Sequence, residues 1–144
     1  MKRVPADRIL VDTGPLVAIL SRTDEHHQAC VEALRAMIAP LLSCWPVITE
    51  AAWLLRRSPQ AVRQLLISVE TGFLEMLPLA GEEAKSIAEL MRRYETMRPQ
   101  LADAALVYLA GREQIETIFT LDRRDFSVYR NARRRSFRIL PEID

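Results

Sequence analysis

Three acidic residues stand where apolar segments of this chain end or are interrupted. Asp12 closes the apolar run in RILVDTGPL, Asp122 closes the run in TIFTLDRRDF, and Asp103 lies inside the apolar stretch LADAALVYLA. A carboxylate at the edge of a hydrophobic core is costly unless a cation or hydrogen-bond donors compensate it. Several such carboxylates in one chain therefore indicate a metal site.

The donor types indicate which metal would bind there. Two like charges about 4 Å apart cost roughly 4 kcal/mol at an effective dielectric constant near 20, so clustered carboxylates must protonate, separate or hold a cation. Oxygen donors without a cluster of histidines or cysteines favour Mg²⁺ or Mn²⁺ over zinc. Such a site can activate water and stabilise negative charge on phosphorus, which phosphodiester hydrolysis requires.

The elements that would position these residues alternate along the chain. Apolar runs predict strands, and amphipathic or apolar stretches of helical length predict helices between them. This order predicts an α/β fold with a mainly parallel central sheet, formed as one domain over residues 1–144. The predicted strands are 8–12, 41–45, 73–79, 117–121 and 136–140, and the main predicted helices are 24–37, 47–57, 59–69, 82–95 and 101–113.

Parallel strands would bring the acidic residues together. Asp12 and Asp122 directly follow strands, and ligands of open parallel sheets bind at the carboxyl ends of the strands. Asp103 and Glu50 fall in early turns of helices that should begin near the same edge. We therefore expect one pocket to contain all four, although each also fits a simpler role, such as a helix cap for Asp12 or a first-turn helix residue for Asp103.

The inner faces of two helices can be predicted from their apolar spacing. The helix over 24–37 should have acidic residues in its first turn, and a buried stripe of Ala29, Ala33 and Met37. The helix over 47–57 should bury Val47, Ala51, Leu54 and Leu55. Trp45 and Trp53 are also expected in the core, where large apolar side chains are usually found.

Charge and composition limit the partners. The net charge is +1, with only two lysines beside 18 arginines, and residues 122–138 hold seven of those arginines. This is consistent with an anionic partner, although a genomic composition bias explains the arginine excess equally well. The sequence shows no signal-peptide pattern and no apolar run of about 18 residues, so we expect a cytoplasmic protein without a membrane span. Cys30 and Cys44 lack paired spacing and are expected to be reduced and buried.

Four of these blocks, in this order, resemble the PIN-domain family, and within it the VapC-type toxin ribonucleases of prokaryotic toxin–antitoxin pairs. They are LVDTGPLVAIL, VITEAAWLL, LADAALVYLA and IFTLDRRDF, all within residues 9–126. The resemblance implies a three-layer α/β/α fold, a divalent metal site for Mg²⁺ or Mn²⁺, and endoribonuclease activity on RNA. It also implies a homodimer and a small antitoxin protein whose terminal segment enters the active-site groove.

The resemblance also assigns roles to individual positions. Asp12, Glu50, Asp103 and Asp122 match the family's four acidic positions, and Asp12, Asp103 and Asp122 would hold the metal. Glu50 would complete the metal shell or orient the attacking water. Supporting roles fall to Thr13, Thr120 and Asp125. Independently of the resemblance, their positive charge makes the arginines at 92, 93, 98, 112 and 123–138 candidates for phosphate contacts.

Other classes fit less well. Phosphatases of the haloacid dehalogenase type need a second aspartate two positions after the first, where this chain has Gly14. A receiver domain needs a late lysine, and none follows Lys85. The remaining alternative is a catalytically inactive PIN-like module that binds RNA or is regulated by a partner; the complete set of four acidic residues favours an active enzyme.

Overall fold

In the computed structural model, which describes residues 8–38 and 40–142, five short strands form a single sheet. The sheet order is β3-β2-β1-β4-β5, and every neighbouring pair is parallel. All five lie inside the predicted runs, but each has only three residues. They are β1 (Ile9–Val11), β2 (Leu41–Ser43), β3 (Leu74–Met76), β4 (Thr117–Phe119) and β5 (Arg138–Leu140).

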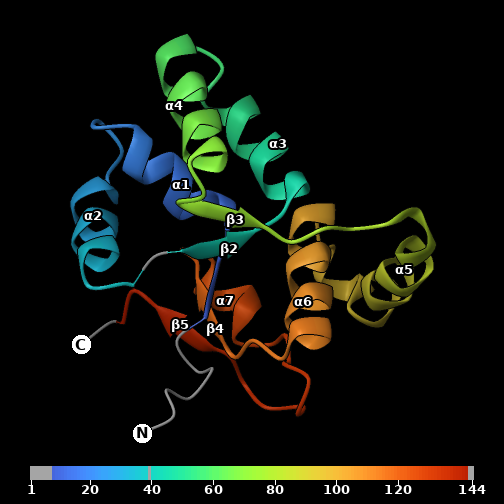
Figure 1. Cartoon of the computed structure of the whole chain (residues 1–144). Helices are drawn as coiled ribbons and strands as arrows, with labels where there is room; N and C mark the ends of the chain where they lie inside the picture. Colours follow the sequence, from blue (N-terminus) through green and yellow to red (C-terminus); the bar gives the residue numbers. More distant parts are fainter. Residues whose placement is uncertain (1–7, 39, 143–144) are drawn as a thin grey trace, which may run out of the picture.

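Helices cover both faces of the sheet, which confirms the predicted α/β/α architecture (Figure 1). The helix α1 contacts α2, α3 and α4, while α6 packs against α5 and α3. The helices are α1 (Thr13–Leu20), α2 (His27–Arg35), α3 (Trp45–Leu54), α4 (Pro59–Glu70), α5 (Ala84–Arg93), α6 (Leu101–Glu113) and α7 (Arg123–Phe126), with short 3₁₀ turns η2 (Gly81–Glu83) and η3 (Glu95–Met97).

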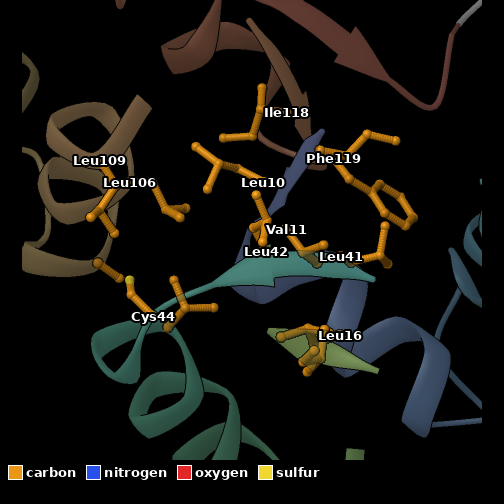
Figure 2. Packing of buried hydrophobic residues seen from close by; sticks show 14 of the residues in the cluster. Leu10, Val11, Leu16, Leu41, Leu42, Cys44, Leu106, Leu109, Ile118 and Phe119 are labelled. Carbon is orange, nitrogen blue, oxygen red and sulfur yellow. The ribbon is translucent and has the colours of Figure 1, made fainter. Parts of the chain in front are cut away.

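The core has two layers because side chains alternate along each strand. Leu10 is in register with Leu42 on one side and Ile118 on the other, and these side chains face Leu106 and Leu109 of α6 (Figure 2). On the opposite face, Val11, Leu41 and Leu74 line one small cavity together with Leu16 of α1 and Leu65 of α4. Both faces of the sheet are therefore buried, as parallel sheets require.

The helix α2 begins three residues later than predicted, at His27 rather than Asp24. The Asp24 carboxylate accepts a hydrogen bond from the His26 amide at 2.8 Å, which forms a turn before the helix, so no acidic residue lies in its first turn. Ala29 is exposed, and Cys30 is the buried residue of this helix. Ala33 and Met37 do pack against the core as predicted.

The helix α3 shows a second difference from the prediction. It begins at Trp45 with Pro46 in its first turn, two residues earlier than predicted. Val47, Ala51 and Leu55 are buried as expected, but Leu54 is 52% exposed, and Trp45 and Trp53 are 55% and 63% exposed. The predicted burial of these three residues is wrong because Ile48, absent from the predicted inner face, completes that face instead.

A short helix, the two cysteines and the lengths of the helices remain to be compared with the predictions. The four-residue helix α7 was not predicted, because its length is too short for a periodic pattern. Cys30 and Cys44 are buried and unpaired, as expected. In the part of the chain that the structure describes, no helix has the length and apolar character needed to cross a membrane.

Candidate functional site

A hollow of about 540 Å³ lies at the edge of the sheet where the parallel strands end. It brings together the four predicted acidic residues and Asp125, although they come from segments far apart in the sequence. Its lining consists of Asp12, Thr13, Gly14, Glu50, Leu54, Arg98, Gln100, Asp103, Leu121, Asp122 and Asp125. The expected convergence on one pocket is therefore observed.

Asp12 lies at the base of this hollow, where β1 ends and α1 begins. Only 6% of the residue is exposed, and each of its carboxylate oxygens accepts one hydrogen bond. Oδ1 accepts from the Thr13 amide at 2.8 Å, and Oδ2 accepts from the Thr120 hydroxyl at 2.7 Å. The first bond is the helix cap expected of an aspartate in this position. The second joins the ends of β1 and β4.

Glu50 and Asp103 approach the hollow from two helices. Glu50 lies in the second turn of α3, and its Oε2 accepts a hydrogen bond from the Thr13 hydroxyl at 3.1 Å. Asp103 lies in the first turn of α6, and its Oδ2 accepts from the Gln100 amide at 3.2 Å. Both carboxylates are thus oriented by neighbouring donors, while their second oxygens have no protein hydrogen bond among the described residues.

The segment after β4 supplies the remaining carboxylates. Asp122 is exposed and caps α7, since its Oδ1 accepts from the Asp125 amide at 3.1 Å. The Asp122 amide in turn donates to the hydroxyl of the fully buried Thr120 at 3.0 Å. Thr120 therefore connects Asp12 and Asp122 through these two hydrogen bonds.

Burial, together with neighbouring negative charge, raises the pKa of three of these groups, Asp12, Asp103 and Asp125. The pKa of Asp103 is raised to about 7, mainly by burial and then by the charge of Asp12. The pKa of Asp12 is raised to about 6, again mainly by burial, although the hydrogen bonds from Thr120 and Thr13 oppose the increase. Perturbed carboxyl groups gathered in one hollow are typical of a functional site.

The chemistry of this donor set fits a hard divalent cation, because all five acidic groups offer carboxylate oxygens. Within residues 8–38 and 40–142, however, no three Asp, Glu, His or Cys side chains lie close enough together to enclose an ion. The acidic side chains are spread around the hollow and are held in part by hydrogen bonds to the protein. Binding an ion would require them to close around it.

Several lining residues were not predicted from the sequence. Leu121 and Leu54 have no sequence signal, and Leu54 was expected in the core. Gln100 could have been found, because an acid three residues after the residue that begins a helix is a capping signature. Tyr129, which does not line the hollow, is a further unexpected residue: it is fully buried, and its hydroxyl has no hydrogen-bond partner among the described residues.

The candidate phosphate-binding arginines differ in their surroundings. Arg98 alone among the described basic residues lines the hollow. Other arginines are bound elsewhere in the protein. Arg112 pairs with Glu83 and Glu113, Arg138 pairs with Glu142, and Arg123 donates to the Pro141 carbonyl.

The fold and the acidic hollow define a class of small α/β/α proteins with carboxylates at the carboxyl edge of a parallel sheet. VapC20 from Mycobacterium tuberculosis, described as a sarcin-ricin loop cleaving toxin, has the same fold, with a TM-score of 0.71. The match covers 76% of this chain and 86% of that protein at 15% sequence identity, so it concerns the fold alone.

Sequence comparison identifies the family. The family model of the PIN domain matches residues 9–132, and the chain therefore belongs to the PIN-domain family. It is also 30% identical over 135 residues to Ribonuclease VapC26 of Mycobacterium tuberculosis (strain ATCC 25618 / H37Rv). That match covers 92% of this chain and all of the relative. The resemblance found in the sequence to this family and to its VapC-type members is confirmed.

Proposed function

We propose that this chain is a divalent-metal-dependent endoribonuclease, formed by a single PIN domain over residues 1–144, and the toxin of a type II toxin–antitoxin pair. The observation that carries the proposal is the hollow in which Asp12, Glu50, Asp103, Asp122 and Asp125 meet. Similarity to a ribonuclease over nearly the whole chain supports RNA as the substrate.

In this proposal Asp12, Asp103 and Asp122 hold Mg²⁺ or Mn²⁺. When bound, the ion supplies an activated water and stabilises negative charge on the phosphate and on the leaving oxygen. The hydrogen bonds from Thr13 and Thr120 fix the Asp12 carboxylate before an ion arrives.

Glu50 has a different role in this proposal: it lines the same hollow, and its second oxygen accepts no hydrogen bond among the described residues. We assign it to orient the attacking water and to accept the proton that this water loses when it attacks phosphorus. The Thr13 hydroxyl holds the other Glu50 oxygen at 3.1 Å, which limits the orientations of the carboxylate. Asp125 adds negative charge at the rim, and its own pKa is raised by burial and by Asp122.

Cleavage of RNA by the purified protein tests this function. A mixed cellular RNA pool would be incubated with the protein and Mg²⁺, Mn²⁺ or EDTA, beside Asp103→Asn and a control, Glu89→Gln, which removes an exposed acid on α5. We expect metal-dependent cleavage that Asp103→Asn loses and Glu89→Gln retains. Intact RNA under every metal condition, with folded protein free of antitoxin, would instead favour an inactive RNA-binding or partner-regulated module.

The exposed apolar residues of α3 provide a surface for the proposed antitoxin. Trp45, Trp53 and Leu54 are each more than half exposed, and Leu54 also lines the acidic hollow. A segment bound along α3 would bury the exposed apolar surface of these side chains, which favours association, and would reach the carboxylates beside Leu54.

Co-purification tests the antitoxin surface. We expect a Trp45→Ala/Trp53→Ala variant to lose the co-expressed antitoxin, and Phe73→Ala, which removes another exposed aromatic residue, to retain it. Retention of the antitoxin by the double variant would contradict the assignment. The proposed homodimer is tested separately, by the mass of the free protein in light scattering.

A further inference from the structure

Arg98 has a distinctive position at the acidic hollow. It is the one basic residue, among those the structure describes, that lines this cavity beside five carboxylates. The residue is exposed, and its guanidinium makes no hydrogen bond or ion pair within residues 8–38 and 40–142. A positive charge is therefore available at the rim of a strongly negative site.

The backbone of Arg98 is held in an unfavourable conformation. Its φ of 51° and ψ of 56° place it in the left-handed region, which residues other than glycine rarely adopt. Pro99 follows, and a residue before proline normally prefers an extended conformation. Two local backbone hydrogen bonds accompany this turn, from the Met97 amide to the Tyr94 carbonyl at 2.9 Å and from the Arg98 amide to the Glu95 carbonyl at 3.0 Å. Glycine would satisfy the conformation better, so the backbone alone does not explain an arginine here.

The turn at Arg98 links two parts of the site. It ends η3, and Pro99 and Gln100 then lead directly into α6. Asp103 lies in the first turn of that helix and accepts a hydrogen bond from the Gln100 amide. The left-handed turn therefore brings the Arg98 cation and the Asp103 carboxylate to the same rim.

The proposed reaction needs a cation at this position. An RNA phosphate is negatively charged and gains charge as water attacks it, while five carboxylates line the hollow. Even with two divalent ions bound, the total positive charge would be smaller than the total negative charge of the five ionised carboxylates. A guanidinium offers donors in a planar fork that matches two phosphate oxygens, which makes it a suitable additional ligand.

We propose that the Arg98 guanidinium binds a phosphate of the RNA at the acidic hollow, and that it is the main phosphate-binding arginine of this site. The assignment rests on the proposed function for its substrate class. It concerns substrate binding only, and contact with phosphate would be independent of base sequence.

Binding of RNA can be measured independently of cleavage. A fluorescein-labelled, single-stranded 20-nucleotide RNA of mixed sequence would be titrated with protein in the Asp103→Asn background, over a series of salt concentrations. Arg98→Gly removes the guanidinium and relieves the left-handed backbone, so its thermal stability should equal or exceed that of the parent. Arg98→Lys retains the positive charge but lacks the paired, coplanar N–H donors of the guanidinium. Arg63→Ala removes an exposed arginine on α4, away from the hollow, and serves as the control.

We expect Arg98→Gly to weaken RNA binding by about tenfold and to reduce the slope of log K against log salt by about one. Arg98→Lys should fall between Arg98→Gly and the parent, and Arg63→Ala should match the parent. Unchanged binding and an unchanged slope in Arg98→Gly would overturn the proposal.

Cleavage by the same Arg98 and Arg63 variants with Asp103 intact separates this proposal from the proposed function. If the unmutated protein cleaves RNA and Arg98→Gly binds and cleaves equally well, the role of Arg98 fails and the nuclease function stands. If no metal supports cleavage but RNA binding depends on Arg98, the nuclease function fails and the phosphate contact stands. If the unmutated protein binds no RNA, both fail.

Discussion

The hydroxyl of Thr120 donates a 2.7 Å hydrogen bond to Oδ2 of Asp12, across 108 positions of sequence. This bond joins the carboxyl ends of the neighbouring strands β1 and β4 beneath the acidic hollow. Thr120 is fully buried and Asp12 nearly so. A hydroxyl in this position stabilises the ionised form of a carboxylate that burial would otherwise keep protonated.

Replacing Thr120 with valine should therefore destabilise the protein. The valine side chain has a similar shape but cannot donate to Asp12 or accept from the Asp122 amide. At pH 8 in EDTA we expect a loss of about 1.5–3 kcal/mol in the free energy of unfolding, the usual range for a hydrogen bond to a charged group. Urea denaturation measures this free energy. Thr120→Ser keeps the hydroxyl, so its free energy of unfolding should fall by less. An equal fall in the two variants would argue against a stabilising role for the hydroxyl.

The metal-free protein should become less stable as the pH rises from about 4 to about 7. The pKa values of Asp12 and Asp103 in the folded protein are about 6 and about 7, above their usual value of 3.8. A group with a raised pKa binds its proton more tightly in the folded state, so its contribution is present at low pH and is lost as the pH rises through this window.

Asp12 alone accounts for roughly 3 kcal/mol, since its pKa lies about 2 units above 3.8 and one unit corresponds to about 1.4 kcal/mol. The partly exposed Asp103 adds an amount that solvent screens, so the expected total loss is roughly 3–5 kcal/mol. Urea denaturation at several pH values in EDTA measures it. Mn²⁺ at pH 7.5 should recover the stability, because an ion that binds only the folded protein stabilises it. A stability that is flat across this range in EDTA would contradict the raised pKa values of Asp12 and Asp103.

Asp103→Asn should make the metal-free protein more stable while removing its activity. The substitution keeps the shape of the side chain and removes one of the charges that crowd the hollow. We expect a rise of a few degrees in the melting temperature at pH 8 in EDTA, corresponding to roughly 1 kcal/mol. Glu89→Gln, which removes an exposed acid on α5, should have little effect. A fall in melting temperature would indicate that Asp103 serves mainly as a helix cap.

Tyr129 and Tyr108 form a matched pair for testing a buried hydroxyl. The Tyr129 ring packs edge to face against Tyr94 and Phe126, while its hydroxyl is buried without a partner among the described residues. Tyr129→Phe removes an unsatisfied group and should leave the free energy of unfolding unchanged or raise it by up to about 2 kcal/mol.

Tyr108→Phe should have the opposite effect. The Tyr108 hydroxyl donates to Glu83 at 2.8 Å, so its removal should lower the free energy of unfolding. Chemical denaturation of both variants beside the parent measures the difference. A larger loss for Tyr129→Phe than for Tyr108→Phe would indicate that the Tyr129 hydroxyl has a partner such as a buried water.

The sequence by itself determined the order of strands and helices and the positions of the acidic residues. Buried parallel strands are continuous apolar runs, so β1 and β4 are visible as such, and the residues that follow them must lie at one edge of the sheet. Asp12 and Asp122 could be placed by this rule alone. The helix α6 is apolar around its whole circumference, which predicts a buried helix with Asp103 in its first turn.

Tertiary structure decided which side chains face solvent and how the site is arranged. Leu54 is exposed and Ile48 buried because the packing partners of α3 set the orientation of that helix, and spacing along the chain cannot specify those partners. The left-handed turn at Arg98 has no sequence signal, because a residue before a proline normally prefers an extended conformation. The Tyr129 hydroxyl, which has no partner among the described residues, has none either, since its burial depends on contacts between distant segments. The raised pKa values of Asp12 and Asp103 arise for the same reason: burial and neighbouring charge exist only once the chain has folded.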